Sequence, residues 1–148
     1  MMYSAIDVAN YVINFSASKN EEITNLKLQK LLYYIDAAFL VEKGESCIFQ
    51  NFKHWRHGPV IPDVYSEFRV YLNTSIPKRE EESSILSEDK DLIDNVIESN
   101  FKFSPWELVD RTHKEKPWLE TKPNEVIDKV IIKDYFLNGN SKRIYGEI

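Results

Sequence analysis

The sequence predicts a mainly α-helical fold, a single compact domain of about six helices with a small β-hairpin. Apolar residues recur at helical spacing in several segments, and polar or proline- and glycine-containing stretches separate these segments. Only one short aromatic stretch alternates like a strand. The chain has 148 residues, no internal repeat and no linker, so we expect residues 1–148 to form one domain with a sizeable core.

The first helix is expected to follow Ser4 and to end near Ala17. Ser4 is a favoured N-cap residue, and Asp7 stands where it can complete a capping box. The apolar residues that repeat behind this cap are Ile6, Val8, Ala9, Val12 and Ile13.

The strongest helical pattern follows a cap at Thr24 or Asn25 and ends at Gly44. Its apolar stripe consists of Leu28, Leu31, Leu32, Ile35, Ala38 and Phe39. Amphipathic side chains flank this stripe, namely Lys27, Gln29, Lys30, Tyr33 and Tyr34. The two tyrosines either close the edge of the core or face a partner.

A small β-hairpin, or two short extended segments, is expected over residues 46–57, with Gly58-Pro59 as its end. Pro62 suits the first position of the next helix, where its missing N–H costs nothing. The buried face of that helix should contain Val64, Tyr65, Phe68 and Leu72. Residues 73–84 should then form a surface loop.

Three further helical segments are expected in the C-terminal half. Ser87 should cap a helix that buries Leu92, Ile93, Val96 and Ile97. Ser104, Pro105 and Glu107 combine an N-cap, a proline at the first helical position and a capping-box glutamate, and this helix should end near Thr112-His113. Pro117-Trp118 begins another turn, and residues 130–137 form a last apolar segment that Gly139 stops.

The net charge of −5 is unevenly distributed along the chain. Residues 80–98 carry a local charge of −7, whereas residues 1–79 are nearly neutral. No cluster of cations suited to phosphates is visible, so direct binding to nucleic acid is unlikely in this chain. The acidic stretch either steers a basic protein partner or is a solvated loop and helix face.

The chain has one cysteine, so an internal disulfide is excluded. A buried structural thiol is the favoured interpretation of Cys47, in preference to a nucleophile. No apolar run approaches 18 residues, and the N-terminus lacks the pattern of a secretion signal. We therefore expect a cytoplasmic protein without a membrane-spanning segment.

The residues offer little for catalysis, and no catalytic residue is assigned. His54 and His57 point to opposite sides of an extended segment, and His113 alone does not complete a metal site. With four glycines the chain cannot build a phosphate-binding loop, and no nucleophile elbow is present. We expect neither enzymatic activity, nor a cofactor, nor a metal. An enzyme with a cryptic pocket is the less favoured alternative.

A cluster suited to binding remains. Trp55, Arg56 and His57 precede the Gly58-Pro59 corner, and Tyr33, Tyr34, Trp106, His113 and Trp118 are similar in kind. Trp, Tyr and Arg are enriched at the energetic centres of protein interfaces. The alternative is that the tryptophans belong to the core and that His113 is a structural histidine.

Three blocks resemble a known family. Residues 26–34 look like its LQKLLYY helix, residues 55–65 look like its W-x-x-GPV-x-P-x-VY block, and residues 112–118 look like its TH-x-E-x-PW block. The order and spacing match across residues 4–137. This family is the Panacea domain, an antitoxin-associated group with SocA-like and phage GepA-like members. His57 departs from the pattern, since many relatives have a tyrosine there.

The resemblance implies a mainly helical antitoxin that neutralises a protein toxin encoded beside it. Direct binding is the usual mode in the family, and toxins of unrelated classes are served by one domain. The alternative, implied by a SocA-like branch, is a proteolytic adaptor that delivers its toxin to the ClpXP protease.

We expect the polar members of the functional surface to be Lys30, Tyr34, Arg56, His57 and His113. The residues expected to support it structurally are Trp55, Gly58, Pro59, Pro62, Tyr65 and Trp118. Arg56 and His57 should form hydrogen bonds to the helix of Tyr33 and Tyr34 or to His113. The 73–84 loop and the acidic helix should help to determine which partner binds.

Overall fold

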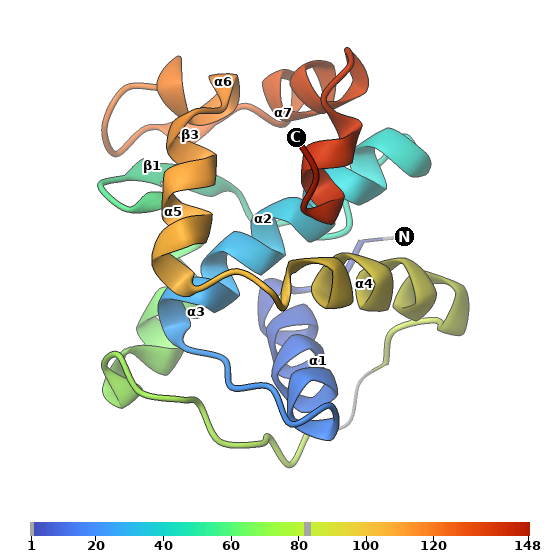
Figure 1. Ribbon diagram of the computed structural model, residues 1–148, viewed down its shortest axis with the longest axis vertical. Coiled ribbons are helices and arrows are strands. Elements are labelled where there is room, and N and C mark those ends of the chain that lie inside the picture. Colours follow the sequence, from blue (N-terminus) through green and yellow to red (C-terminus); the bar gives the residue numbers. More distant parts are fainter. Residues whose placement is uncertain (1, 82–83) are drawn as a thin grey trace.

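The computed structural model describes residues 2–81 and 84–148. These ranges contain seven α-helices, two 3₁₀ helices and a three-stranded sheet, which confirms the mainly helical prediction (Figure 1). The helices are α1 (Ala5–Ser18), α2 (Asn25–Glu42), α3 (Pro62–Phe68), η1 (Arg69–Tyr71), α4 (Ser87–Asn100), α5 (Pro105–His113), α6 (Lys116–Leu119), α7 (Lys129–Leu137) and η2 (Ser141–Tyr145). None of the helices in the described ranges is long and apolar enough to cross a membrane.

Helix α2 crosses the centre of the molecule and is covered on every side. It packs against α1, α3, α4, α5, α7, η2 and β2 (Figure 1). All of its 18 residues are buried except Leu26, Val41 and Glu42. The predicted apolar stripe is confirmed, since all of its residues are buried. The polar residues that flank it are buried as well, so Tyr33 and Tyr34 belong to the core rather than to a surface that faces a partner.

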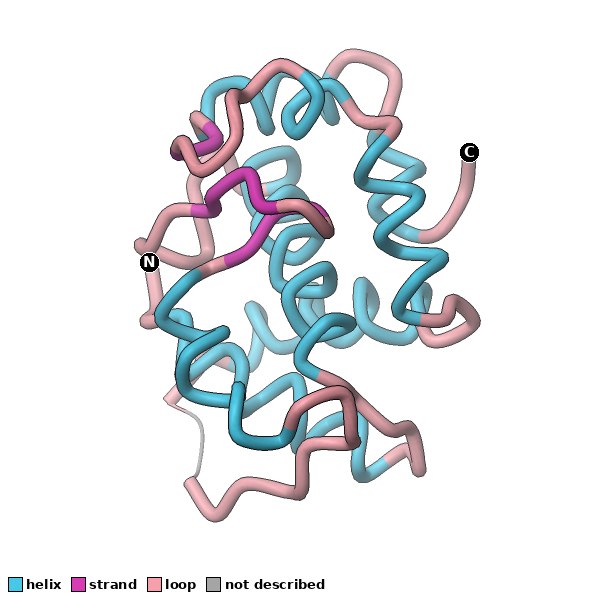
Figure 2. Tube along the Cα trace, turned by 90° about the vertical axis from the view of Figure 1, so that its left-hand side faces the viewer, coloured by secondary structure: helices cyan, strands magenta, loops and turns pink. Residues whose placement is uncertain are grey.

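The sheet lies on one side of the molecule, as Figure 2 shows. Its strands β1 (Phe52–Trp55), β2 (Gly58–Val60) and β3 (Val126–Ile127) are antiparallel, in the order β2-β1-β3. Trp55 pairs with Gly58, so Arg56-His57 form the turn of the hairpin. Gly58-Pro59 therefore belong to the second strand, and the prediction that they end the hairpin is wrong. The pairing of Phe52 with Ile127 was not predicted.

Most helix boundaries follow local capping signals. Ser4 and Thr24 accept hydrogen bonds from backbone N–H groups of the first turns of α1 and α2, and Ser104 forms the full capping box with Glu107. Pro62 is the first residue of α3, as expected. Gly44 and Gly139 follow the ends of α2 and α7 with positive φ angles.

Three expectations about individual residues are wrong. Leu86, not Ser87, is the N-cap of α4, and no side chain caps this helix. Leu72 lies beyond η1 and is 76% exposed, because α3 ends at Phe68 and the predicted buried face does not continue. Val64 and Phe68 are buried as predicted, while Tyr65 is exposed.

The described part of the 73–84 loop is attached to the helices beneath it. Ile76 is buried, and its backbone N–H donates to the Ile23 carbonyl over 2.8 Å. The backbone of Arg79 exchanges two hydrogen bonds with the Asn14 side chain. Residues 82 and 83, which include part of the predicted acidic run, lie outside the described residues.

The acidic stretch is not a uniformly solvated face. Asp89 is buried, where it pairs with Lys43 and accepts a hydrogen bond from the Tyr3 hydroxyl. Asp94 likewise accepts a hydrogen bond from Tyr11. These carboxylates help to hold α4 against α1 and the end of α2.

A buried carboxylate on α2 organises the chain that follows this helix. Asp36 accepts hydrogen bonds from the Ser46 hydroxyl (2.8 Å) and from the backbone N–H groups of Cys47 (2.8 Å) and Ile48 (3.0 Å). The Lys129 ammonium lies 3.1 Å from Asp36 and links α7 to this cluster. Burial raises the pKa of the Cys47 thiol, which fits a structural thiol.

Replacing Asp36 by asparagine should lower the free energy of unfolding by about 3 kcal/mol. All four groups around this carboxylate are donors, and an amide offers them one oxygen and a competing N–H₂ group. Urea unfolding measures the loss. Asp134→Asn, on the exposed face of α7, is the matched control and should change stability by less than about 0.5 kcal/mol. Equal stability of the two variants would contradict the role given to Asp36.

Candidate functional site

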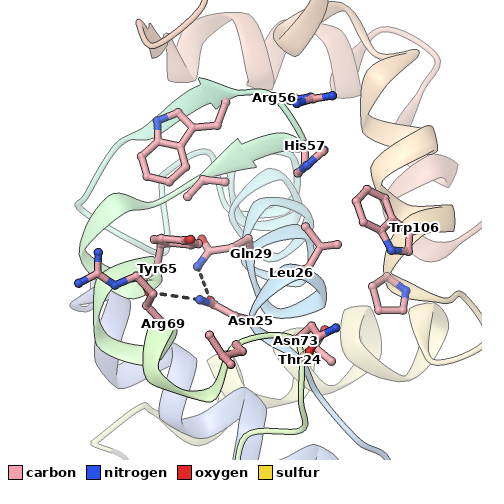
Figure 3. A pocket seen from close by; sticks show the side chains of 14 residues that line it. Thr24, Asn25, Leu26, Gln29, Arg56, His57, Tyr65, Arg69, Asn73 and Trp106 are labelled. Atoms are coloured by element: carbon pink, nitrogen blue, oxygen red, sulfur yellow. Dashed lines mark hydrogen bonds between the residues drawn. The ribbon is translucent and has the colours of Figure 1, made fainter.

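An open groove of about 520 Å³ lies where the hairpin, the start of α2, the α3–η1 segment and the start of α5 meet (Figure 3). The residues that line it are Thr24, Asn25, Leu26, Gln29, Trp55, Arg56, His57, Val60, Tyr65, Arg69, Leu72, Asn73, Pro105 and Trp106. Segments distant in the sequence form its walls, so the groove exists only in the folded chain.

The walls of the groove expose aromatic and apolar side chains. Trp106 is 57% exposed, and its ring meets the His57 ring edge to face with centroids 4.9 Å apart. Across the groove, the Trp55 and Tyr65 rings make a similar contact at 5.3 Å. Leu72 adds an exposed aliphatic side chain at the rim. Such surfaces release water on contact with a partner, which favours binding.

Hydrogen bonds hold the polar floor of the groove in place. The Asn25 amide donates to the Tyr65 carbonyl (3.2 Å), and the Gln29 amide donates to the Asn25 side-chain oxygen (3.0 Å). The oxygen of Gln29 accepts the Ile61 N–H over 3.0 Å. Since these groups already have partners, the floor is a rigid platform and the rim carries the free donors.

The charged side chains at the rim are cationic. Arg56 extends from the hairpin turn and Arg69 from the opposite wall, and both are exposed (Figure 3). Neither guanidinium forms an ion pair with any residue in the described ranges. No carboxylate is among the described residues that line the groove. The groove therefore suits groups that are apolar or negatively charged.

The corner after the hairpin turn packs directly onto α2. Gly58 has a φ of +106°, which favours glycine, and a Cβ at this position would stand 2.7 Å from Thr112 Oγ1 and 2.8 Å from Lys30 Cε. Lys30 Nζ donates to the Pro59 carbonyl over 3.0 Å. Gly58 and Pro59 are both buried, and they place the turn above the groove.

Three stacked rings hold the other side of the turn. The Trp118 indole lies between the His54 and His113 rings, with centroid distances of 4.1 and 4.2 Å. Trp118 Nε1 donates to the Trp55 carbonyl, and His113 Nε2 lies 3.0 Å from the Arg56 carbonyl. The expected link between the turn and His113 therefore forms through the backbone of Arg56 rather than through its side chain.

The structure separates the five polar residues predicted for the functional surface. Arg56 and His57 line the groove, and His113 lies behind the turn, partly buried against Trp118. Lys30 and Tyr34 are fully buried, so the expectation that they belong to an exposed surface is wrong. The helical pattern placed them off the apolar stripe, but other elements cover that side of α2.

Tyr34 takes part in a buried ion-pair network instead. Its hydroxyl donates to Glu115 Oε2 over 2.9 Å, and Arg143 Nε approaches the same oxygen to 2.9 Å. Burial raises the pKa of Glu115, while Arg143 and Tyr34 act in the opposite direction. The network ties α2, α6 and η2 together beneath the surface.

The predicted supporting residues have different places. Trp55 and Tyr65 line the groove, Gly58 and Pro59 form the buried corner, Pro62 starts α3, and Trp118 is the centre of the ring stack. Arg69, Leu72 and Pro105 were missed as groove residues. No signal in the neighbouring sequence predicts that Leu72 is exposed, because its position fits the apolar period of the preceding helix.

A cluster of side chains suited to a metal ion is not visible in the described ranges. They contain no group of three or more His, Cys, Asp or Glu side chains placed to hold a metal ion. The groove presents rings, guanidinium groups and amides, which bind partners by contact and hydrogen bonding.

Gly58→Ala should lower the free energy of unfolding by at least about 2 kcal/mol more than Gly139→Ala does. Both glycines have positive φ angles, so both variants incur the backbone strain, but a Cβ at Gly139 meets no atom within 4 Å. The difference between the two losses of stability therefore measures the clash of the added Cβ with Thr112 and Lys30. Chemical unfolding of the two variants measures it, and equal losses would refute the close packing of the corner.

The buried Lys30 should make stability depend on pH. Burial lowers the pKa of Lys30 to about 7, so between pH 7 and 10 the unfolded chain binds more protons at this site than the folded one. The free energy of unfolding of the native chain should therefore rise with pH. Between pH 7 and pH 9 it should increase by about 2 kcal/mol more than that of the Lys30→Met variant. Urea unfolding of both proteins at the two pH values tests this. A constant difference would contradict a neutral buried amine.

The comparisons with known proteins agree with the resemblance seen in the sequence. Residues 28–119 match the family described as antitoxin SocA-like, Panacea domain. The chain is 34% identical over 124 residues to antitoxin SocA of Caulobacter vibrioides (strain NA1000 / CB15N), with 75% of this chain and 66% of that protein covered. The chain thus spans just under two thirds of that relative's length. No solved structure is significantly similar to it.

The family match includes most of α2, the hairpin, α3, η1, α4, α5 and α6. It therefore contains both the buried helix that organises the fold and most residues of the groove. On this match, which spans more than half of the sequence, the chain belongs to the SocA-like antitoxin family of Panacea domains.

Proposed function

We propose that this chain is an antitoxin that neutralises a cognate protein toxin by binding to it directly, with the groove as the contact surface. One observation carries the proposal: apart from Thr24, Asn25 and Leu26, every residue that lines the groove falls inside the family-matched segment 28–119. The part of the chain that resembles known antitoxins is thus the part that exposes rings and guanidinium groups.

The composition of the groove supports a protein partner. Exposed Trp, Tyr and Arg side chains are the types that contribute most to protein interfaces, because each removes a large area from water and retains a polar tip. Trp106 projects from the first turn of α5, where the capping box fixes the backbone. The contact surface therefore requires little reorganisation on binding. The proposal gives the chain no catalytic step, cofactor or metal.

Coexpression tests the function. The protein encoded beside this chain is produced in a bacterial host with and without the chain, and growth, toxin abundance and co-purification are measured. Direct neutralisation predicts restored growth with an abundant toxin in a stable complex. Restored growth with a toxin that disappears only when ClpXP is active would instead identify a proteolytic adaptor. Failure both to restore growth and to co-purify would overturn the antitoxin proposal.

Trp106→Ala should weaken toxin binding by about 30-fold or more, which corresponds to about 2 kcal/mol. Because the side chain is 57% exposed, the free protein should lose little stability. Phe49→Ala is the matched control, since Phe49 is also 57% exposed but does not line the groove. Titration calorimetry with the co-purified toxin gives both affinities. Equal effects of the two substitutions would move the contact surface away from the groove.

A further inference from the structure

Building on the proposed function, we propose that the groove binds an acidic segment of the toxin, in which carboxylates flank a large apolar side chain. Arg56 and Arg69 receive the carboxylates from opposite walls, and Trp106, Tyr65 and Leu72 surround the apolar side chain. The partner is thus identified by its chemistry, as a protein segment with negative charge and one apolar anchor.

The charge of the groove is opposite to that of the whole chain. The net charge is −5, yet the described lining contains two exposed guanidinium groups and no carboxylate. The long helix α2 begins at the groove with no acidic residue in its first turn, so its N-terminal dipole adds to the positive potential. A carboxylate that reaches either arginine can form bidentate hydrogen bonds with its guanidinium group.

Leu72 gives an independent sign that the rim is built for contact. It has φ +55° and ψ −126°, a conformation that suits glycine at the first central position of a type II′ turn. The turn is closed by a hydrogen bond from Thr74 N to the Tyr71 carbonyl, and Leu72 N donates to the Arg69 carbonyl at the end of η1, both over 3.0 Å. The side chain gains almost nothing from folding, since it is 76% exposed.

A strained residue whose side chain faces water lowers the stability of the free protein. The physical use of Leu72 is therefore expected in a contact that forms only with the partner. Its position beside Arg69 places an apolar group next to a cation at the rim, which matches an apolar side chain next to a carboxylate in the bound segment.

A protein segment fits this groove better than a nucleic acid does. A phosphate backbone is held by several clustered cations along a track. Here the described lining holds two arginines on separate segments, Arg56 on the hairpin turn and Arg69 at the end of α3, and the chain as a whole repels polyanions. A short acidic and apolar segment satisfies both arginines and covers the rings at the same time.

Selection of peptides on the full chain tests the chemistry without knowledge of the toxin. A displayed library of random short peptides is selected on the immobilised chain and on the Arg56→Glu/Arg69→Glu variant. The native chain should enrich peptides with Asp or Glu beside a large apolar residue, and the variant should bind these at least about tenfold more weakly. Lys133→Glu/Lys142→Glu gives the same net charge away from the groove and should retain the preference.

Leu72→Gly provides a second readout that a purely structural role would not give. It should raise the melting temperature or leave it unchanged, because glycine adopts the turn without strain, while the affinity for the selected peptide falls about fivefold or more. Asn20→Gly is the control, since Asn20 also has a positive φ, of 58°, but does not line the groove. It should not change peptide binding.

The outcomes separate this inference from the proposed function. Enrichment of neutral or basic peptides, no enrichment, or a preference that survives charge reversal at Arg56 and Arg69 would overturn the inference, even if coexpression restores growth. Binding of a labelled single-stranded oligonucleotide that the same reversal abolishes would also overturn it. Acidic peptides that depend on both arginines would support it, whether or not the neighbouring protein is a toxin.

Discussion

Helix α2 is surrounded by protein, so most of its polar side chains depend on partners in other segments. The buried Tyr33 hydroxyl is the exception on this helix, with no hydrogen-bond partner among the described residues. A buried polar group without a partner costs free energy, and a buried charge costs more. Lys27 therefore donates to the carbonyls of Phe101 and Phe103. Gln29 accepts a hydrogen bond from the Ile61 N–H, and Lys30 donates to the Pro59 carbonyl. Asp36 accepts hydrogen bonds from residues 46–48. These contacts fix the backbone of three peripheral segments, near residues 101–103, 59–61 and 46–48, so the sequence of one helix helps to determine where the chain around it lies.

The groove is a consequence of this arrangement. Gln29 and Lys30 attach the strand-to-helix corner to α2, and the ring stack around Trp118 fixes the turn that carries Arg56. Hydrogen bonds within the floor already engage the Asn25 and Gln29 side chains. Arg56 and Arg69 at the rim are exposed and form no ion pair with any of the described residues. The fold thus separates buried residues that maintain structure from exposed residues at the rim.

Local signals allowed much of the helical fold to be predicted, and long-range packing limited the rest. Caps at Ser4, Thr24 and Ser104 act within one turn, so the sequence alone locates these helix starts. The burial of Lys30 depends on a corner 29 residues away, and strand β3 pairs with a partner more than 70 residues away. Helical periodicity shows only which apolar residues share one face of a helix. It therefore cannot show that a lysine or tyrosine is buried by segments distant in the sequence. For the groove, residue type indicated Arg56 and His57, but no local pattern distinguished Leu72 from a core residue.

The same separation means that substitutions at the rim and on α2 should have different effects. Substitution of a buried polar residue on α2 breaks a hydrogen bond and releases a whole segment, so such changes act on folding. Arg69, Leu72 and Trp106 are exposed, and the free protein gains little from their side chains. Changes there alter the charge and shape of the rim at small cost to stability. The floor beneath them is held by its own hydrogen bonds and stays rigid when a rim residue is replaced. Binding can therefore change while the fold does not.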